Sequence, residues 1–179
     1  MIFFDILLAK KLSGGGDIVG YFVEGANLKP ENMRVEITTP KGVTELVENA
    51  FYNKTPRITK ATLTDIVTIG NYAFRSNEYL VEVKMPKVVT IGTSAFDGCK
   101  IIETIDIPST ITTIGNNAFA DTRALKDFYC RATTPPTIKY YTFQNSAVQN
   151  IYVPAESVNT YKAANVWNSH ASKIKAIPQ

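Results

Sequence analysis

One seven-residue phrase occurs three times at nearly even spacing, and this repetition restricts the possible folds more than any other feature of the chain. The copies read TIGNYAF, TIGTSAF and TIGNNAF, and they end at Phe74, Phe96 and Phe119. This spacing lies within the fixed period of about 20 to 29 residues that is typical of a solenoid, in which each repeat packs mainly on its neighbours. The sequence therefore predicts a stack of similar coils.

Weaker copies extend the array in both directions. VTELVENAF ends at Phe51 and TIKYYTF ends at Phe143, each about one period away from the nearest full copy. About five units, each of roughly 22 to 24 residues, thus cover residues 43–154. The first and last units depart from the phrase, which is expected of terminal repeats because one of their faces has no further repeat to pack on.

An apolar triplet with the pattern L-x-x-I-x-I follows each phenylalanine. Its last two members alternate with polar residues, which is the period of a β-strand. Proline follows three of these strands, at Pro86, Pro108 and Pro154, and ends them because it cannot donate a hydrogen bond to a neighbouring strand. The predicted inward residues are Ile58, Ala61 and Leu63; Leu80, Val83 and Met85; Ile102, Ile105 and Ile107; Leu125, Phe128 and Cys130; and Val148, Ile151 and Val153.

Each unit is therefore expected to contain a strand, a turn, a second short extended piece and a helical turn that ends in Ala-Phe. Gly70, Gly92 and Gly115 follow the short extended piece, where we expect a bend with a φ angle above zero. We expect the phenylalanines to stack along the solenoid axis as an aromatic column. The phrase is thus interpreted as structural, because every coil would bury the same side chains against those of its neighbours.

The repeat resembles the BspA-type (Treponema pallidum-type) leucine-rich repeat, whose pattern is L-x-x-I-x-I-P-x-x-v-x-x-I-G-x-x-A-F-x-x-C. The stretches IIETIDIPSTITTIGNNAF and TIGTSAFDGCKII match it almost position by position. The resemblance covers about two thirds of the chain, and the closing segment IYVPAESVNTYKAANVWN is also similar to the end of such arrays. The resemblance implies a binding or adhesive module of the kind found in bacterial surface proteins, without catalysis.

The predicted fold is α+β and β-rich: a right-handed leucine-rich-repeat solenoid with a strand cap before it and a helical cap after it. Residues 17–42 contain two predicted strands, around IVGYFVE and NMRVEIT, which form the N-terminal cap. Residues 155–179 form the C-terminal cap, in which a short helix and the residues after it place Val158, Tyr161 and Trp167 on the last coil.

Residues 1–16, MIFFDILLAKKLSGGG, are expected to form a short apolar helix on a glycine-rich tether. The segment lacks the charge order and the cleavage site of a signal peptide, and its apolar run is too short for a transmembrane helix. It loosely resembles the N-termini of structural proteins from phages and prophages of Gram-positive bacteria. We therefore expect a chain made in the cytoplasm and presented on a cell surface or in a virion. The helix is expected to pack on its own domain or on a partner, and homo-oligomer or virion assembly through residues 1–16 is an open alternative.

Residues that carry chemistry are sparse. The chain has one histidine, His170, interpreted as a surface residue, and two cysteines, Cys99 and Cys130, interpreted as packing residues. We therefore predict no catalytic site, no metal site and no cofactor. The net charge is only +3 and the basic residues are interspersed, which argues against nucleic-acid binding.

The outward residues of the predicted strands form the candidate ligand face. Parallel stacking would place row-mates about 4.8 Å apart. Tyr129 beside Tyr152 would form a flat, exposed platform for a sugar ring or a protein hot spot, and Lys84 beside Asp106 could form an ion pair. One predicted row is Lys60, Glu82, Thr104, Asp127 and Asn150, and the other is Thr62, Lys84, Asp106, Tyr129 and Tyr152.

Two functions remain open from the sequence. The first is a non-enzymatic protein- or glycan-binding module for adhesion or interaction, presented by the solenoid. The alternative is a virion or tail structural protein anchored through residues 1–16, with the repeat domain facing outward. Nothing in the residues identifies the ligand.

Overall fold

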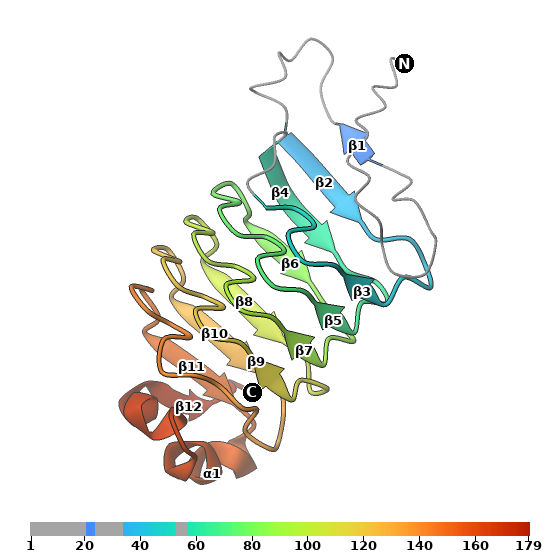
Figure 1. Ribbon diagram of the computed structural model, residues 1–179. Coiled ribbons are helices and arrows are strands. Elements are labelled where there is room, and N and C mark those ends of the chain that lie inside the picture. Colours follow the sequence, from blue (N-terminus) through green and yellow to red (C-terminus); the bar gives the residue numbers. More distant parts are fainter. Residues whose placement is uncertain (1–20, 24–33, 53–56) are drawn as a thin grey trace.

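The computed structural model describes residues 21–23, 34–52 and 57–179 as an array of short strands closed by helical turns (Figure 1). The predicted helix and tether over residues 1–16 lie outside the described residues. One set of strands, the main row, is β1 (Tyr21–Val23), β2 (Arg34–Thr38), β4 (Arg57–Thr62), β6 (Glu82–Lys84), β8 (Thr104–Ile107), β10 (Asp127–Cys130), β11 (Asn150–Val153) and β12 (Ile174–Ala176). A second set, the short row, is β3 (Glu45–Leu46), β5 (Thr68–Ile69), β7 (Thr90–Ile91) and β9 (Thr113–Ile114). The helical segments are η2 (Ala155–Ser157), α1 (Val158–Ala163) and η3 (Trp167–Lys173).

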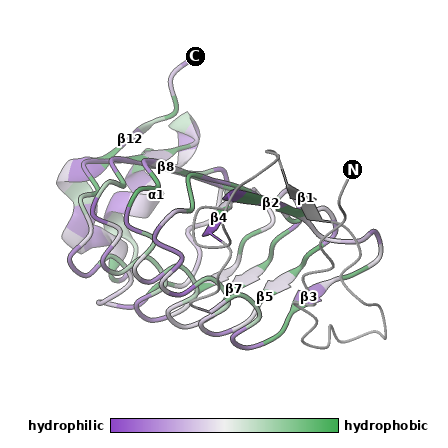
Figure 2. Ribbon diagram, turned by 90° about the horizontal axis from the view of Figure 1, so that it is seen from above, coloured by the Kyte–Doolittle hydropathy of each residue, from purple (hydrophilic) through white to green (hydrophobic). Residues whose placement is uncertain are grey.

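The two rows lie on opposite sides of the molecule, and the chain winds between them once per repeat (Figure 2). Hydrogen-bonded neighbours follow the orders β1-β2-β4-β6 and β8-β10-β11-β12 in the main row and β3-β5-β7-β9 in the short row. Strands β6 and β8 lie side by side, so the main row runs from one end of the array to the other (Figure 1). This arrangement confirms the predicted α+β, β-rich solenoid.

Strands of the main row pair in parallel at a spacing of one repeat. Ile105 is the Cα partner of Phe128, which in turn is the partner of Ile151. Every member of the five predicted apolar triplets is buried. The alternation of apolar and polar residues therefore predicted correctly which side chains enter the core.

The recurrent phrase of each repeat builds a continuous aromatic column, as predicted. The ring centroids are 5.1 Å apart for Phe51 and Phe74, 5.3 Å for Phe74 and Phe96, 5.4 Å for Phe96 and Phe119, and 5.9 Å for Phe119 and Phe143. The rings are stacked, with interplanar angles of 23°, 5°, 2° and 16° in that order. Each coil thus contributes one aromatic ring to the core at the same place.

The expected positive φ at Gly70, Gly92 and Gly115 is wrong, because none of the three has a φ in the left-handed region. These positions are glycine because two coils approach each other closely. A Cβ on Gly92 would lie 2.6 Å from the backbone nitrogen of Asn71 in the preceding coil, and a Cβ on Gly115 would lie 2.5 Å from that of Thr93. A real side chain does not fit at such distances, so glycine sets the spacing between coils at this corner.

Positive φ angles occur instead at two other positions, one shortly before and one shortly after the phenylalanine. The predicted helical turn is therefore a run of hydrogen-bonded turns and not a helix, because a left-handed residue interrupts the helical backbone. The earlier position is Asn49, Tyr72, Ser94 and Asn117, and the later one is Ser76, Gly98, Asp121 and Asn145.

The ends of the main row are closed differently. At the N-terminal end, β1 runs antiparallel to β2, whereas β2 pairs in parallel with β4. These two strands confirm the strand prediction around residues 21–23 and 34–38; residues 17–20 and 24–33 lie outside the described residues. The parallel ladder therefore begins at Arg34.

At the C-terminal end, the predicted cap helix is present as η2 and α1, followed by η3. Tyr161 and Trp167 are fully buried against the last coil, as predicted. The Tyr161 hydroxyl donates to the carbonyl oxygen of Ala132, and the Trp167 indole N–H donates to that of Pro136, both at 2.8 Å. These hydrogen bonds satisfy the polar atoms of both rings, so the cap covers the final repeat without leaving them unpaired.

Candidate functional site

The outward surface of the main row, called the sheet face below, brings the predicted ligand residues into register. None of the ten predicted residues is buried. Their side chains therefore form two aligned rows that are open to a partner. The Cα partners are Lys60 with Glu82, Thr62 with Lys84, Thr104 with Asp127, Asp106 with Tyr129, Asp127 with Asn150, and Tyr129 with Tyr152.

Tyr129 and Tyr152 are stacked on each other on strands β10 and β11. Their ring centroids are 4.7 Å apart and their planes differ by 23°. Both residues are half-buried, so the expected exposed, flat platform is wrong: each ring covers one face of the other. This stacking leaves the ring edges, with their hydroxyl groups, and the outer face of each ring uncovered by the other ring.

The hydroxyl of Tyr129 stays protonated over a wide pH range. Burial, and after it the nearby carboxylate of Asp127, raises the pKa of Tyr129 above its ordinary value of 10.0. The guanidinium of Arg131 acts in the opposite direction but does not cancel this. At neutral pH the hydroxyl is thus a neutral group that can donate and accept hydrogen bonds.

Charged groups around the tyrosine pair are satisfied within the sheet face. Arg131 donates two hydrogen bonds of 2.7 Å to the carboxylate of Asp106. The amide of Asn150 donates to Asp127 at 2.7 Å, and its oxygen accepts from Lys175 at 2.7 Å. This half of the sheet face therefore presents paired charges beside an aromatic pair.

The predicted ion pair between Lys84 and Asp106 is wrong. Lys84 contacts Glu82 on its own strand at 3.3 Å, and the carboxylate of Asp106 is held by Arg131. A planar guanidinium can bind both carboxylate oxygens at once, which gives Arg131 an advantage over the single ammonium group of Lys84.

The N-terminal half of the sheet face is hollowed, which sequence reasoning did not predict. The register between β2 and β4 shifts between Val35 and Glu36, so that Thr59 is an extra residue in β4, a β-bulge. A hollow of about 610 Å³ lies at this point. Its lining residues are Arg34, Glu36, Thr38, Thr59, Lys60, Tyr79, Val81 and Ile101.

Three apolar side chains in this hollow are exposed, with exposed fractions of 41% for Tyr79, 51% for Val81 and 45% for Ile101. A signal for them exists in the sequence, because Tyr79 and Ile101 occupy the same position in successive repeats, just before the predicted inward triplet. They lie outside the two outward rows of the strands, so the predicted ligand face did not include them.

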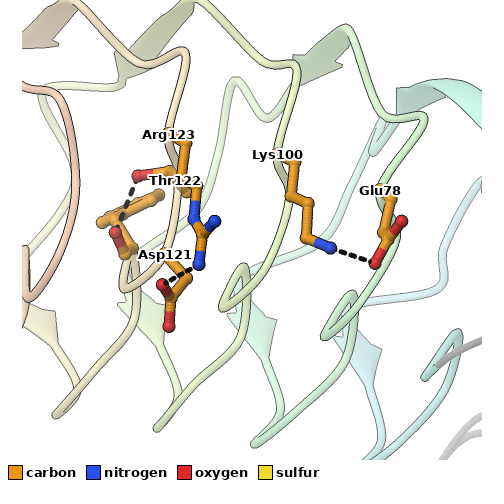
Figure 3. Close-up of polar contacts among 6 residues, drawn as sticks. Glu78, Lys100, Asp121, Thr122 and Arg123 are labelled. Atoms are coloured by element: carbon orange, nitrogen blue, oxygen red, sulfur yellow. Dashed lines mark hydrogen bonds and ion pairs between the residues drawn. The ribbon is translucent and has the colours of Figure 1, made fainter.

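The turns on the phenylalanine side of the coils carry ion pairs that link neighbouring repeats (Figure 3). Lys100 contacts Glu78 of the preceding coil at 2.5 Å, while Arg123 and Asp121 pair within one turn at 3.4 Å. The hydroxyl of Thr122 donates to the carbonyl oxygen of Phe119 at 2.7 Å. These contacts satisfy polar groups of the coils, so we assign this edge a structural role.

His170 is half-buried, so its interpretation as a surface residue is wrong in this respect. Its ring packs edge-on against Phe143, with 5.5 Å between centroids. Burial, followed by the charge of Lys173, lowers the pKa of His170 below its ordinary value of 6.5. The histidine is thus part of the packing between the C-terminal cap and the aromatic column.

The two cysteines are buried, as the packing interpretation predicted. Burial raises the pKa of both thiols, and Cys130 lies 3.2 Å from the Tyr161 hydroxyl. In the described part of the chain no three His, Cys, Asp or Glu side chains are grouped so that they could hold a metal ion. That same part contains no helix with the length and apolar character needed to cross a membrane.

Comparisons with solved structures identify similar folds. A Treponema pallidum leucine-rich repeat protein is 20% identical, with a TM-score of 0.57 over 75% of this chain and 69% of its own. A Faecalibacterium prausnitzii leucine-rich cell surface protein is 21% identical, with a TM-score of 0.58 over 89% of this chain and 42% of its own. The pneumococcal vaccine antigen PcpA is 22% identical, with a TM-score of 0.52 over 80% of this chain and 42% of its own. This chain thus spans less than half the length of the last two proteins.

Sequence comparisons agree with the fold. A search of curated proteins finds no match. The family model of the BspA-type leucine-rich repeat region matches six copies over residues 44–173, which is more than half of the chain. Together with the stacked coils and the aromatic column, this match shows that the chain belongs to the BspA-type leucine-rich repeat family.

Proposed function

We propose that this chain is a non-enzymatic interaction module that binds a protein through the sheet face, in the manner of a surface adhesin. The observation that carries the proposal is the stacked pair of Tyr129 and Tyr152, half-buried at 4.7 Å from each other among paired charges. Tyrosine is enriched in the energetic centres of protein interfaces because its ring offers a large contact area and its hydroxyl a hydrogen bond.

The ring geometry favours a protein over a glycan as the ligand. A sugar ring stacks on the open face of an aromatic ring, but Tyr129 and Tyr152 cover each other's inner faces. On the outer side of Tyr129, the register partner is Asp106, whose carboxylate is held by Arg131. On the outer side of Tyr152, the register partner is Lys175. The pair thus offers ring edges with hydroxyl groups between charged neighbours, which suits backbone and side-chain groups of a protein partner.

The restricted conformational freedom of the side chains around the tyrosine pair supports the same proposal. The two rings brace each other, and the bidentate contact of Arg131 with Asp106 holds the neighbouring charges in place. Side chains that are already ordered lose less conformational freedom when a partner binds. The family match and the similarity to a leucine-rich cell surface protein are consistent with display on a bacterial surface.

An array experiment tests this proposal. Fluorescently labelled chain is applied to arrays of surface proteins and of glycans, as wild type and as the Tyr152→Ala variant. Tyr141→Ala serves as the control, because Tyr141 is exposed but lies on the turn side of the last repeat. We expect protein ligands whose signal falls at least about tenfold in Tyr152→Ala and not in Tyr141→Ala, as for an interface hot spot. Glycan hits that depend on Tyr152, or protein hits that do not, would contradict the proposal.

A further inference from the structure

Two arginines lie side by side at the N-terminal end of the sheet face. Arg34 on β2 and Arg57 on β4 are direct Cα partners in the parallel ladder. Among the residues that the structure describes, neither guanidinium has a carboxylate partner. Like charges opposite each other on neighbouring strands destabilise a sheet, so folding alone does not account for this pair.

The arginine pair adjoins the hollow at the bulge of β4. The guanidinium carbon of Arg57 lies over the ring of Tyr79 at 4.2 Å from its centroid, and Arg34 lines the hollow together with Tyr79. This contact is a cation–π interaction, which holds the Arg57 guanidinium against the ring while its N–H groups can still donate hydrogen bonds. The hollow therefore combines cationic donors with an apolar floor of Val81 and Ile101.

Other charges nearby do not neutralise the arginines. Glu36 is paired with Lys60 at 2.9 Å, and Glu82 is paired with Lys84 at 3.3 Å. Strands β2, β4 and β6 thus carry four cationic and two anionic side chains, which leaves a positive surplus. A complementary partner has to bring negative charge.

We propose that this hollow is a second recognition site, separate from the tyrosine pair, which binds an extended acidic and apolar segment of a partner protein. Carboxylates of the segment accept hydrogen bonds from Arg34 and Arg57, and an apolar side chain covers Val81 and Ile101. A guanidinium pair is well suited to carboxylates because each can donate two parallel hydrogen bonds. The two aliphatic side chains favour a peptide over an acidic glycan, since they offer hydroxyl groups no hydrogen-bonding partner.

Binding of a defined peptide tests the site. The probe is a short fluorescein-labelled peptide of alternating glutamate and leucine, followed by fluorescence anisotropy and by chemical shifts of the backbone amides. Peptides of alternating lysine and leucine and of alternating glutamate and serine, and an oligogalacturonate, are the competing probes. We expect the glutamate–leucine peptide to bind tightest and to shift the amides of Arg34, Arg57 and Val81 most.

Variants assign the binding to the arginines and to the floor. Arg34→Gln/Arg57→Gln is expected to weaken binding about tenfold or more. Lys126→Gln/Lys162→Gln is the matched control, because it removes the same charge from two exposed lysines away from the hollow. Val81→Ser removes the apolar contact at an exposed position, so it tests the floor even if the double arginine variant is poorly folded. Thermal melting of each variant confirms its fold.

Each outcome decides the proposal. Loss of binding in the arginine variant and in Val81→Ser, with the control and Tyr152→Ala unchanged, supports a separate site of this chemistry. No amide shifts at high peptide concentration, equal loss in the lysine control, or tighter binding of the oligogalacturonate overturns it. Loss in Tyr152→Ala would instead show that this peptide binds at the tyrosine pair, and so would overturn the separate site without affecting the proposed function.

Discussion

The two halves of the sheet face are built on the same scaffold but differ in how their charged side chains are paired. In the C-terminal half, β8, β10, β11 and β12 carry two anionic side chains and one cationic one, and all three are bound by neighbouring groups. In the N-terminal half, Arg34 and Arg57 stand opposite each other beside exposed apolar residues. The repeat therefore fixes which residues are buried, whereas the outward residues differ from one repeat to the next.

The difference also has a geometric cause. Between β8, β10 and β11 the register is regular, which allows Tyr129 and Tyr152 to stack at the spacing of the strands. Between β2 and β4 the bulge at Thr59 interrupts the ladder, and the sheet face is hollowed there. Bulges commonly redirect side chains near functional sites. The regular ladder lets neighbouring side chains stack, whereas the hollow lies where Thr59 has no partner in β2.

The largest expected effect concerns the scaffold that both halves share. Phe96→Ala removes a fully buried ring from the centre of the aromatic column, so we expect the free energy of unfolding to fall by about 3 to 5 kcal/mol. Chemical denaturation measures this change. Phe96→Leu, which keeps most of the volume, is the control and should lose clearly less. A loss below about 1 kcal/mol in Phe96→Ala would mean that the column does not carry the core.

The next effect tests why glycine recurs at the same position in the three central coils. Gly92→Ala places a methyl group 2.6 Å from the backbone of the preceding coil, so the coils must separate, and we expect a loss of about 3 kcal/mol. Gly98→Ala is the matched control. Gly98 has a φ of 74° but its added Cβ would lie 3.6 Å from the nearest atom, so only backbone strain of about 1 kcal/mol is expected. Equal losses, or the reverse order, would contradict the close-approach explanation.

A smaller effect on the free energy of unfolding should differ in sign between the two halves of the sheet face. Arg131→Gln breaks a half-exposed ion pair and should lower the free energy of unfolding by up to about 1 kcal/mol. Arg34→Gln relieves the repulsion from Arg57 and should leave stability unchanged or raise it by up to about 0.5 kcal/mol. Urea unfolding at low salt measures both, and added salt should shrink the difference. If Arg34→Gln destabilises the fold more than Arg131→Gln, the arginine pair has a structural role.

The smallest expected effect concerns the C-terminal cap. Because burial lowers the pKa of His170 in the folded state, the unfolded chain binds more protons near pH 6.5. The contribution of His170 to the free energy of unfolding is therefore fully present above its unfolded pKa. It is lost as the pH falls through the folded pKa, and it changes no further below that value. Thermal melting between about pH 5 and pH 8 measures this dependence. His170→Gln should flatten the curve in this range; a variant with an unchanged slope would show that another group is responsible.

The interior of this protein was predictable because its signal is local and repeated. Alternation of apolar and polar residues identified Ile105 and Ile107 as inward without any knowledge of the fold, and the period aligned them with Phe128 and Cys130. The stacked tyrosines followed from the same register. Each of these features depends only on strand period and repeat length.

The remaining features depend on distances between coils or on competition between partners. The role of Gly92 lies in the backbone of the preceding coil, which a local pattern does not contain. Asp106 pairs with Arg131 and not with Lys84, and this outcome depends on side-chain geometry after folding. The hollow lies where Thr59 has no partner in β2, and the inward residues of β4 keep the same spacing as in the other repeats, so the sequence pattern does not show this shift.

We propose the sheet face as the recognition surface, and not the turns on the phenylalanine side of the coils. Peptides that bind the whole chain are first selected from a random library displayed on yeast. The most direct measurement is then amide hydrogen exchange of this protein with and without each selected peptide. We expect each selected peptide to slow amide exchange either along β4 and β6, with loss of binding when Arg57 is replaced, or along β10 and β11, with loss of binding when Tyr152 is replaced. Protection concentrated on the turns around Arg123 and Tyr141, with binding unchanged in the sheet-face variants, would contradict this assignment.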